Sequence, residues 1–241
     1  MPDARLLSRL YRLSPQRILN ACRTAYWIAR RPAIIRGYFA ANASPKLQIG
    51  AGFHRMPGWL NSDILPRYSD TIYLDITGRF PLPDDCLDYV LSEHIIEHIP
   101  YPDADHAVKE CFRVLKPGGR LRLATPDLLQ LLGLYTPTPS DIQRQYTTWI
   151  THTFVPYATA PTACFVINNA FRNWGHQFLY DEATLTEMLS AAGFTDVARC
   201  EPSESTEPAL RNVDYHAECI EDANMNRFES MIFECRKPDR P

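Results

Sequence analysis

The stretch from Lys46 to Gly52 constrains the fold more than any other part of this chain. It reads Lys-Leu-Gln-Ile-Gly-Ala-Gly, which predicts a short buried strand that runs directly into a glycine-rich turn. Glycines let the backbone of a turn approach a ligand closely, because no Cβ stands in the way. Because G-x-G triplets are common in tight turns, this stretch indicates a binding turn only in combination with acidic residues later in the chain.

Acidic residues close the next two predicted strands. Asp63 ends the run that begins at Trp59, and Asp75 ends the run that begins at Thr71. An open parallel sheet holds a nucleoside with a glycine turn after its first strand and a carboxylate on the ribose hydroxyls at the end of a neighbouring strand. The sequence therefore predicts an α/β protein, with helices between further strands at residues 88–92, 120–124, 194–197 and 228–235.

Charge is unevenly distributed along the 241 residues. Residues 1–46 carry nine Lys or Arg and one acid, and the net charge of −3 for the whole chain leaves −11 on the remainder. Such asymmetry predicts a basic arm on an acidic body. We expect an N-terminal helical arm over 1–45 and one catalytic domain over 46–241, with a helical and loop insertion at about 128–178 that caps the site.

The basic arm has apolar residues at helical spacing, punctuated by arginines. Pro15 and Pro32 are expected to divide it into separate pieces. Two roles remain open: packing on the sheet domain with solvated arginines, or peripheral contact with an anionic membrane surface. The acidic body argues against nucleic acid as a partner.

The cysteine pattern and the hydropathy indicate a cytoplasmic protein. The seven cysteines are scattered without any C-x-x-C pair, which fits reduced thiols better than a disulfide framework. The first residues lack the apolar stretch of a secretory signal, and no window reaches the roughly 18 apolar residues that a membrane-spanning helix needs.

Several further motifs, taken in order, resemble those of class I S-adenosylmethionine-dependent methyltransferases, most closely a small bacterial, type 11-like branch. The resemblance implies a Rossmann-like, seven-stranded, mostly parallel sheet with an antiparallel last strand. It also implies S-adenosylmethionine as cofactor and S-adenosylhomocysteine as product. The matching segments are Gly50–Gly52, Pro57–Trp59, Asn61, Asp63–Ile64, Phe80–Asp85, Ser92–His98, Leu115–Leu123, Phe178–Leu185 and Ala192–Val197.

The same resemblance implies which residues hold the cofactor. Gly50 and Gly52 would line its methionine and ribose portion, and Asp63 would accept hydrogen bonds from the ribose hydroxyls. Asp75 and Ile76 would border the adenine. The complete expected set is Gln48, Gly50, Ala51, Gly52, Asp63, Asp75, Ile76, Ser92, Glu93 and His94.

Three features depart from the family pattern. Gln48 stands where an acidic residue is usual, and His54 stands where a third glycine often stands. The link from Gly52 to Trp59 is too short for the usual crossover helix, since parallel crossovers take about a dozen residues or more. Either this loop crosses the sheet edge unaided, or the N-terminal helices supply the missing cover.

Two other cofactor or metal classes fit less well. A nicotinamide dinucleotide site requires G-x-G-x-x-G opening a helix, but Arg55 holds the third position and Pro57-Gly58 forbids a helix there. The string from His94 to His98 fits the H-x-x-E-H motif of inverted zinc peptidases, which works on a helix, whereas here it begins at a strand end.

A divalent metal is a second expectation for the same string. It is similar to the E-x-x-E-H string of some hydroxyl methyltransferases that bind a divalent ion. No metal is favoured, but if one is present its ligands would be His94, Glu97 and His98. Otherwise Glu97 and His98 would hydrogen-bond backbone groups.

The expected reaction is O-methylation of a small hydroxylated acceptor, such as a sugar or glycan precursor or another metabolite. A neutral hydroxyl needs a base, and imidazole titrates near neutral pH, so the candidate catalytic residues are His94, His98 and His176. Two alternatives stay open: a non-catalytic cofactor-binding or scaffold module, and a metal-assisted hydroxyl methyltransferase.

Overall fold

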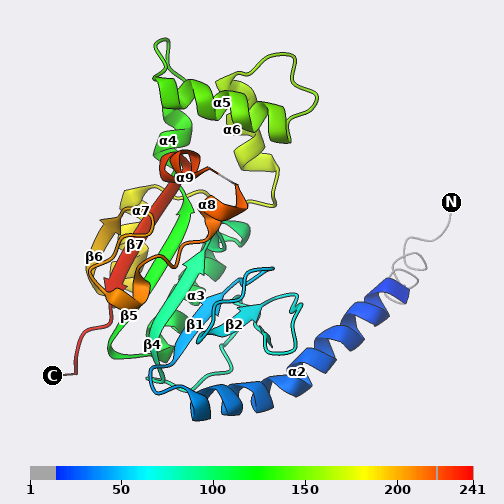
Figure 1. Ribbon diagram of the computed structural model, residues 1–241, viewed down its shortest axis with the longest axis vertical. Coiled ribbons are helices and arrows are strands. Elements are labelled where there is room, and N and C mark those ends of the chain that lie inside the picture. Colours follow the sequence, from blue (N-terminus) through cyan, green and yellow to red (C-terminus); the bar gives the residue numbers. More distant parts are fainter. Residues whose placement is uncertain (1–14, 221, 241) are drawn as a thin grey trace.

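The sheet has seven strands, and a computed structural model describes it within residues 15–220 and 222–240 (Figure 1). The strand order is β3-β2-β1-β4-β5-β7-β6. β7 is antiparallel to both its neighbours, and the other pairs are parallel, which confirms the expected fold class. The strands are β1 (Lys46–Ile49), β2 (Leu60–Asp63), β3 (Ile72–Tyr73), β4 (Leu87–Glu93), β5 (Leu115–Pro126), β6 (Thr195–Cys200) and β7 (Ser230–Arg236).

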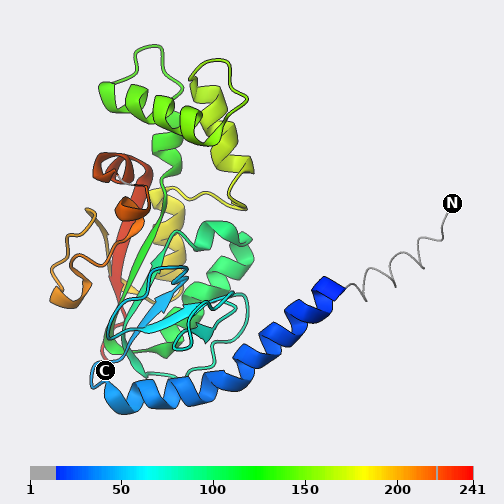
Figure 2. The same ribbon diagram turned by 45° about the vertical axis from the view of Figure 1, so that its right-hand side comes forward.

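Helices surround this sheet and extend beyond one end of it. Figure 2 shows α3 and α7 on one face, with the loop that leads from β6 toward α8 on the other. The described helices are α2 (Pro15–Ala41), η1 (Ile96–His98), α3 (Tyr101–Val114), α4 (Leu128–Gly133), α5 (Asp141–Phe154), α6 (Ala163–Arg172), α7 (Glu182–Ala191), η2 (Pro208–Leu210), α8 (His216–Cys219) and α9 (Ala223–Glu229).

The two faces of β4 pack against different partners, as expected for a strand whose side chains alternate. Val90 belongs to the main core, which includes apolar side chains of α3 and α7. Leu91 points to the opposite face, where it packs with Leu210 and Val213 from the loop before α8. That loop therefore takes the place of a covering helix over this part of the sheet.

Helix α2 is continuous through Pro32, so the prediction that this proline divides the arm is wrong. A division at Pro15 stays a prediction, because residues 1–14 lie outside the described part of the chain. Pro32 lies inside the helix, and Figure 1 shows that the helix bends along its length. A proline removes one backbone hydrogen bond and kinks a helix. Here the last turns are held against the main core by four side chains, namely Ile34, Ile35, Tyr38 and Phe39.

The same helix supplies the cover that the short first crossover lacks. The ten residues between β1 and β2 contain turns and no helix, and α2 packs beside β3 instead. The Tyr38 hydroxyl accepts a hydrogen bond from Lys46 N at 2.7 Å, and the carbonyls of Lys46 and Gly58 lie 2.9 and 3.0 Å from it. This hydroxyl joins α2 to the start of β1.

Replacing Tyr38 with phenylalanine should lower the free energy of unfolding by about 1–2 kcal/mol, because Lys46 N and one carbonyl lose their partner in a half-buried place. The midpoint of urea unfolding measures this. Tyr26→Phe, on an exposed part of the same helix, is the control and should change stability by less than about 0.5 kcal/mol. Equal midpoints for the two variants would contradict the anchoring role.

The N-terminal half of α2 projects away from the sheet in both views (Figures 1 and 2). Ile18, Leu19 and Tyr26 are exposed on it, and its sequence contains arginines and no acid. Contact with an anionic membrane surface stays a prediction. Among residues 15–220 and 222–240, no helix is both long and apolar enough to cross a membrane.

Helices α4, α5 and α6 form a cap beyond the carboxyl ends of β4 and β5 (Figure 1). They enclose a small apolar core of their own, which includes Leu131, Tyr146, Ile150 and Val166. Helix α5 begins with a capping box, in which Ser140 and Gln143 satisfy each other's backbone N–H groups. The domain division expected from the sequence stays a prediction, but these helices lie where they can close the site.

Candidate functional site

A cavity of about 300 Å³ lies at the carboxyl ends of β1 and β4. Open α/β sheets bind ligands at this edge. Six residues of the expected cofactor set line it: Gln48, Gly50, Ala51, Gly52, Glu93 and His94. The other lining residues are Ile49, Phe53, His54, Leu91, Ile95, Tyr215 and His216. We call this space the glycine-turn cavity.

The glycine turn is held in a conformation that needs glycine. Gly50 and Gly52 have φ values of +74° and +52°, in the left-handed region that other residues rarely adopt. A Cβ on Gly50 would lie 2.0 Å from Cδ1 of Ile95. Asp63, at the end of β2, accepts a 2.8 Å hydrogen bond from Gly52 N and a 2.7 Å bond from Leu65 N. Its carboxylate therefore lies directly beside the turn.

Two observations fit this cavity to S-adenosylmethionine. Oε1 of Gln48 is buried without a hydrogen-bond partner, which leaves an acceptor for a polar ligand group. A Cβ on Gly52 would meet nothing within 4 Å, so the backbone there is open to a ligand. The turn, the open backbone and the neighbouring Asp63 carboxylate suit the methionine and ribose portions of the cofactor.

Four expected cofactor residues do not line the glycine-turn cavity: Asp63, which lies beside the turn, and Asp75, Ile76 and Ser92. The Asp75 carboxylate is exposed and accepts hydrogen bonds from Thr77 N and Thr77 Oγ1. Ile76 belongs to the main core, and Ser92 is buried in β4 opposite Ile49. The expected contacts of Asp75 and Ile76 with the adenine, and of Ser92 with the part of the cofactor near the sulfonium, stay predictions.

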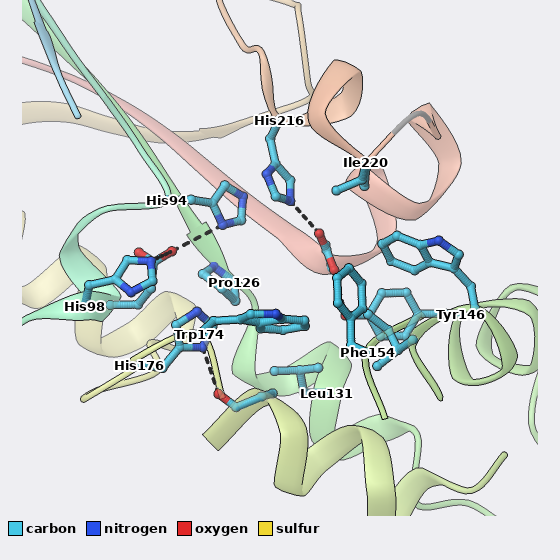
Figure 3. Close-up of a pocket in the computed structure, with 15 residues that line it drawn as sticks. His94, His98, Pro126, Leu131, Tyr146, Phe154, Trp174, His176, His216 and Ile220 are labelled. Atoms are coloured by element: carbon cyan, nitrogen blue, oxygen red, sulfur yellow. Dashed lines mark hydrogen bonds and ion pairs between the residues drawn. The ribbon is translucent and has the colours of Figure 1, made fainter. Parts of the chain in front are cut away.

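A second cavity, of about 210 Å³, lies between the end of the sheet and the cap helices (Figure 3). Its walls are mainly apolar and aromatic, and we call it the aromatic cavity. It shares His94 and His216 with the glycine-turn cavity. Its apolar lining comprises Pro126, Leu131, Tyr146, Trp149, Ile150, Phe154, Ala170, Trp174 and Ile220, and its titratable lining comprises His94, Glu97, His98, His176, His216 and Glu229.

His94 lies at the junction of the two cavities, with a φ of +51°. Its Nε2 lies 2.9 Å from Ser230 Oγ, and its Nδ1 lies 3.2 Å from Oε1 of Glu97. Burial, and next the charge of His216, lower the pKa of His94 to about 3. The ring is therefore neutral near pH 7, and such a low pKa makes it a poor proton acceptor.

His98 and His176 approach each other on the opposite wall, with ring centroids 4.9 Å apart. Nδ1 of His176 lies 2.7 Å from the carbonyl of Ala170, so it carries the proton and leaves Nε2 as an acceptor. Burial lowers the pKa of His176. Figure 3 shows both rings facing the aromatic cavity. Their catalytic roles stay predictions.

Glu97 stands between these histidines. It is fully buried, and burial raises the pKa of its carboxyl. Oε2 accepts a hydrogen bond from Thr125, but Oε1 has no hydrogen-bond partner. Ligand atoms of Glu97, His98 and His176 all lie within 4.8 Å of one another. The structure thus groups His176, rather than the expected His94, with the other two candidate metal ligands.

Sequence reasoning missed His216 and Glu229. Nε2 of His216 lies 2.6 Å from Oε1 of Glu229, and the hydroxyl of Tyr146 donates a 2.7 Å hydrogen bond to Oε2. The His216 ring stacks on His94 with centroids 3.8 Å apart. No motif around His216 identifies it as a site residue, because its partners come from elements that are distant in the chain.

The unusual His54 also acquires a structural explanation. Its ring stacks on Tyr215, with centroids 3.7 Å apart and an interplanar angle of 10°. The backbone N–H groups of Tyr215 and His216 donate to the carboxylate of Glu93 at the end of β4. A ring contact and a carboxylate therefore fix the segment before α8 over the glycine-turn cavity.

Comparisons with known proteins point in the same direction. Residues 48–123 match the methyltransferase domain family Methyltransf_11. A probable S-adenosylmethionine-dependent methyltransferase of Mycolicibacterium smegmatis is 32% identical over 117 residues, which cover 48% of this chain and 32% of that protein. One from Mycobacterium tuberculosis is 30% identical over 151 residues, which cover 62% and 42%. The chain thus spans less than half the length of these curated relatives.

A solved structure described as an S-adenosylmethionine-dependent methyltransferase from Archaeoglobus fulgidus aligns with 98% of this chain and 100% of that chain. The sequence identity is 17% and the TM-score is 0.45.

Proposed function

Because this chain carries a class I S-adenosylmethionine-dependent methyltransferase domain, we propose that it transfers the methyl group of S-adenosylmethionine to a hydroxyl of a small acceptor. The glycine-turn cavity would hold the cofactor, and the aromatic cavity would hold the acceptor. The cofactor supplies an electrophilic methyl group bonded to a sulfonium sulfur. The residues of this chain position the acceptor against that methyl group and exclude water, which can supply much of the rate enhancement.

One observation carries this proposal: the two cavities meet at His94 and His216. In-line transfer requires that an acceptor atom reach the methyl group from the side opposite the sulfur. Adjacent cavities that share lining residues support such an arrangement of cofactor and acceptor. A protein that only stores a nucleoside has no need of the second cavity.

The lining of the aromatic cavity supports a compact acceptor with an apolar or planar face. Trp149, Phe154 and Trp174 offer ring surfaces that stack on an aromatic or sugar ring. The imidazoles of His94 and His216 lie where the two cavities meet, and the other imidazoles and carboxyl groups line the aromatic cavity. A hydroxyl placed there would find a hydrogen-bonding group that can receive its proton.

Calorimetric titration with S-adenosylhomocysteine tests the cofactor assignment, and we expect one molecule bound per chain. Incubation with methyl-labelled S-adenosylmethionine and a matched pair of probes, 4-methylphenol and 4-methylaniline, tests the acceptor atom. The expected product is the methyl ether of the phenol. Absence of S-adenosylhomocysteine binding would reject the whole proposal, whereas labelling of the amine alone would reject the hydroxyl acceptor.

A second candidate is metal-assisted transfer to a hydroxyl, favoured by the buried Oε1 of Glu97, which accepts no hydrogen bond and lies beside His98 and His176. The carbonyl of Ala170 fixes the His176 tautomer, as hydrogen-bonded carbonyls do for histidines that bind a metal through the other ring nitrogen. A divalent ion held there would polarise an acceptor oxygen.

Titration with Co²⁺, followed by its visible absorption bands, tests the metal site. We expect one ion per chain, and Glu97→Gln should weaken binding at least about tenfold because it removes the charged ligand. Glu182→Gln, on an exposed side chain far from the cavity, is the control. Equal Co²⁺ binding by both variants would reject the site.

A further inference from the structure

We propose that His216, held by Glu229, is the group that accepts the proton of the acceptor hydroxyl. This inference rests on the proposed function and adds the catalytic residues that the sequence did not indicate. Both side chains come from the segment of α8 and α9 and line the aromatic cavity, and His216 also lines the glycine-turn cavity.

The hydrogen bonds around His216 determine which nitrogen can act. Its Nε2 is bound to Glu229 Oε1 at 2.6 Å, and a carboxylate only accepts, so Nε2 carries a proton. Among the described residues no hydrogen bond involves Nδ1, which is therefore the nitrogen with a lone pair. Tyr146 donates to the other oxygen of Glu229, and this bond fixes the carboxylate (Figure 3).

Position distinguishes His216 from the other histidines of the aromatic cavity. It lines both cavities, whereas His98 and His176 line only the aromatic one. His94 also lines both, but its Nε2 is engaged by Ser230 and its Nδ1 faces Glu97. Of the two rings at the junction, His216 is the one with a carboxylate hydrogen-bonded to one nitrogen and, among the described residues, no hydrogen bond at the other.

The charges around His216 agree with this role. Burial lowers the pKa of His216, but the hydrogen bond and charge of Glu229 outweigh burial, and the pKa ends above its ordinary value. The carboxyl groups of Glu93 and Glu97 act in the same direction. His94, which is neutral, stacks on the ring. A proton received at Nδ1 is thus stabilised by carboxylates on more than one side.

In the proposed step the proton of the acceptor O–H moves to Nδ1 of His216. The oxygen electron pair forms the new O–C bond, the C–S bond breaks, and its electron pair stays on sulfur. His216 becomes an imidazolium paired with Glu229, and solvent later removes the extra proton. The step needs no further reactant.

The test uses 4-nitrophenol as a probe of the chain saturated with S-adenosylhomocysteine, because loss of its proton produces a yellow phenolate band. A separate calorimetric titration measures the fraction of the chain that has bound 4-nitrophenol. In the wild type, bound probe should ionise at a lower pH than free probe. His216→Gln should abolish that shift, and Glu229→Gln should reduce it, because the pKa of His216 falls without the carboxylate. His152→Gln, on an exposed ring of α5, should behave as the wild type.

Two results would overturn the inference. In the first, the probe binds the wild-type complex as the neutral phenol. In the second, the probe ionises equally in the wild type and in the His216→Gln variant. If the probe fails to bind, ¹⁵N chemical shifts of the His216 ring decide, since the proposal requires the proton on Nε2 and a bare Nδ1 in the neutral ring. S-adenosylhomocysteine binding with a neutral probe would reject this residue assignment and leave the proposed function standing.

Discussion

Replacing Gly50 with alanine should weaken S-adenosylhomocysteine binding by roughly a hundredfold, which corresponds to about 2.7 kcal/mol. The backbone at Gly50 has a φ of +74°, and an L-residue there costs about 1–2 kcal/mol. The new methyl group would lie 2.0 Å from Cδ1 of Ile95, so that side chain must move. Because Gly50 and Ile95 both line the glycine-turn cavity, each adjustment changes its shape.

Two further variants separate the causes of this loss. Gly50→Ala combined with Ile95→Ala removes the steric contact but keeps the backbone strain, so binding should recover in part. Gly37→Ala is the matched control, because Gly37 lies in α2 with nothing within 4 Å of a built Cβ. It should leave affinity unchanged and stabilise the helix by roughly 0.5–1 kcal/mol. Calorimetry showing Gly50→Ala within threefold of wild type would contradict the cofactor placement.

The parts of the fold that the sequence could predict are those determined by residues close together in the chain. The β1 strand, its glycine turn and the acid at the end of β2 lie within about twenty residues, and each has its own composition signal. The cap of α7 is equally local: Asp181 accepts from Thr184 N, and Gly193 follows the helix with a φ of +104°. Such features do not depend on the rest of the chain.

The prediction for α2 was wrong because tertiary contact outweighed a local signal. A proline in a helix interior costs about 3 kcal/mol. Burial of a single large apolar side chain contributes about 1.5–3 kcal/mol, and Ile34, Ile35 and Phe39 all pack on the main core after Pro32. Several such contacts exceed the local penalty, so the helix continues past the proline.

The site was only partly predictable, because it also depends on tertiary contacts between residues that are far apart in the chain. The histidines after β4 were visible because they follow a strand end in a recognisable string. The partner of His94 at Nε2 is Ser230, 136 residues away, and His216 meets His94 across a similar distance in the chain. A pairing of this kind follows from the β5-β7-β6 order, in which the last strand of the chain, β7, lies between β5 and β6.

Replacing Arg122 with methionine should lower the free energy of unfolding by about 3–5 kcal/mol, because it leaves buried carboxylates without their cation. Arg122 lies in β5 and has no exposed surface. Its guanidinium makes a bidentate pair with Asp214 and a further bond to Glu234. For a chain of this length the melting temperature should fall by roughly 10 °C.

The same variant should also loosen the wall of the glycine-turn cavity. Arg122 donates to the carbonyl of Glu201 and, with Asp214, fixes the loop that leads to Tyr215 and His216. Arg227→Met is the matched control, since Arg227 pairs with Glu201 at an exposed position and should change stability by less than about 1 kcal/mol. If burial of unpaired charge is the cause, adding Asp214→Asn and Glu234→Gln to Arg122→Met should restore stability. If Arg122→Met and Arg227→Met have the same melting temperature, the contacts of Arg122 with Asp214 and Glu234 do not hold this wall.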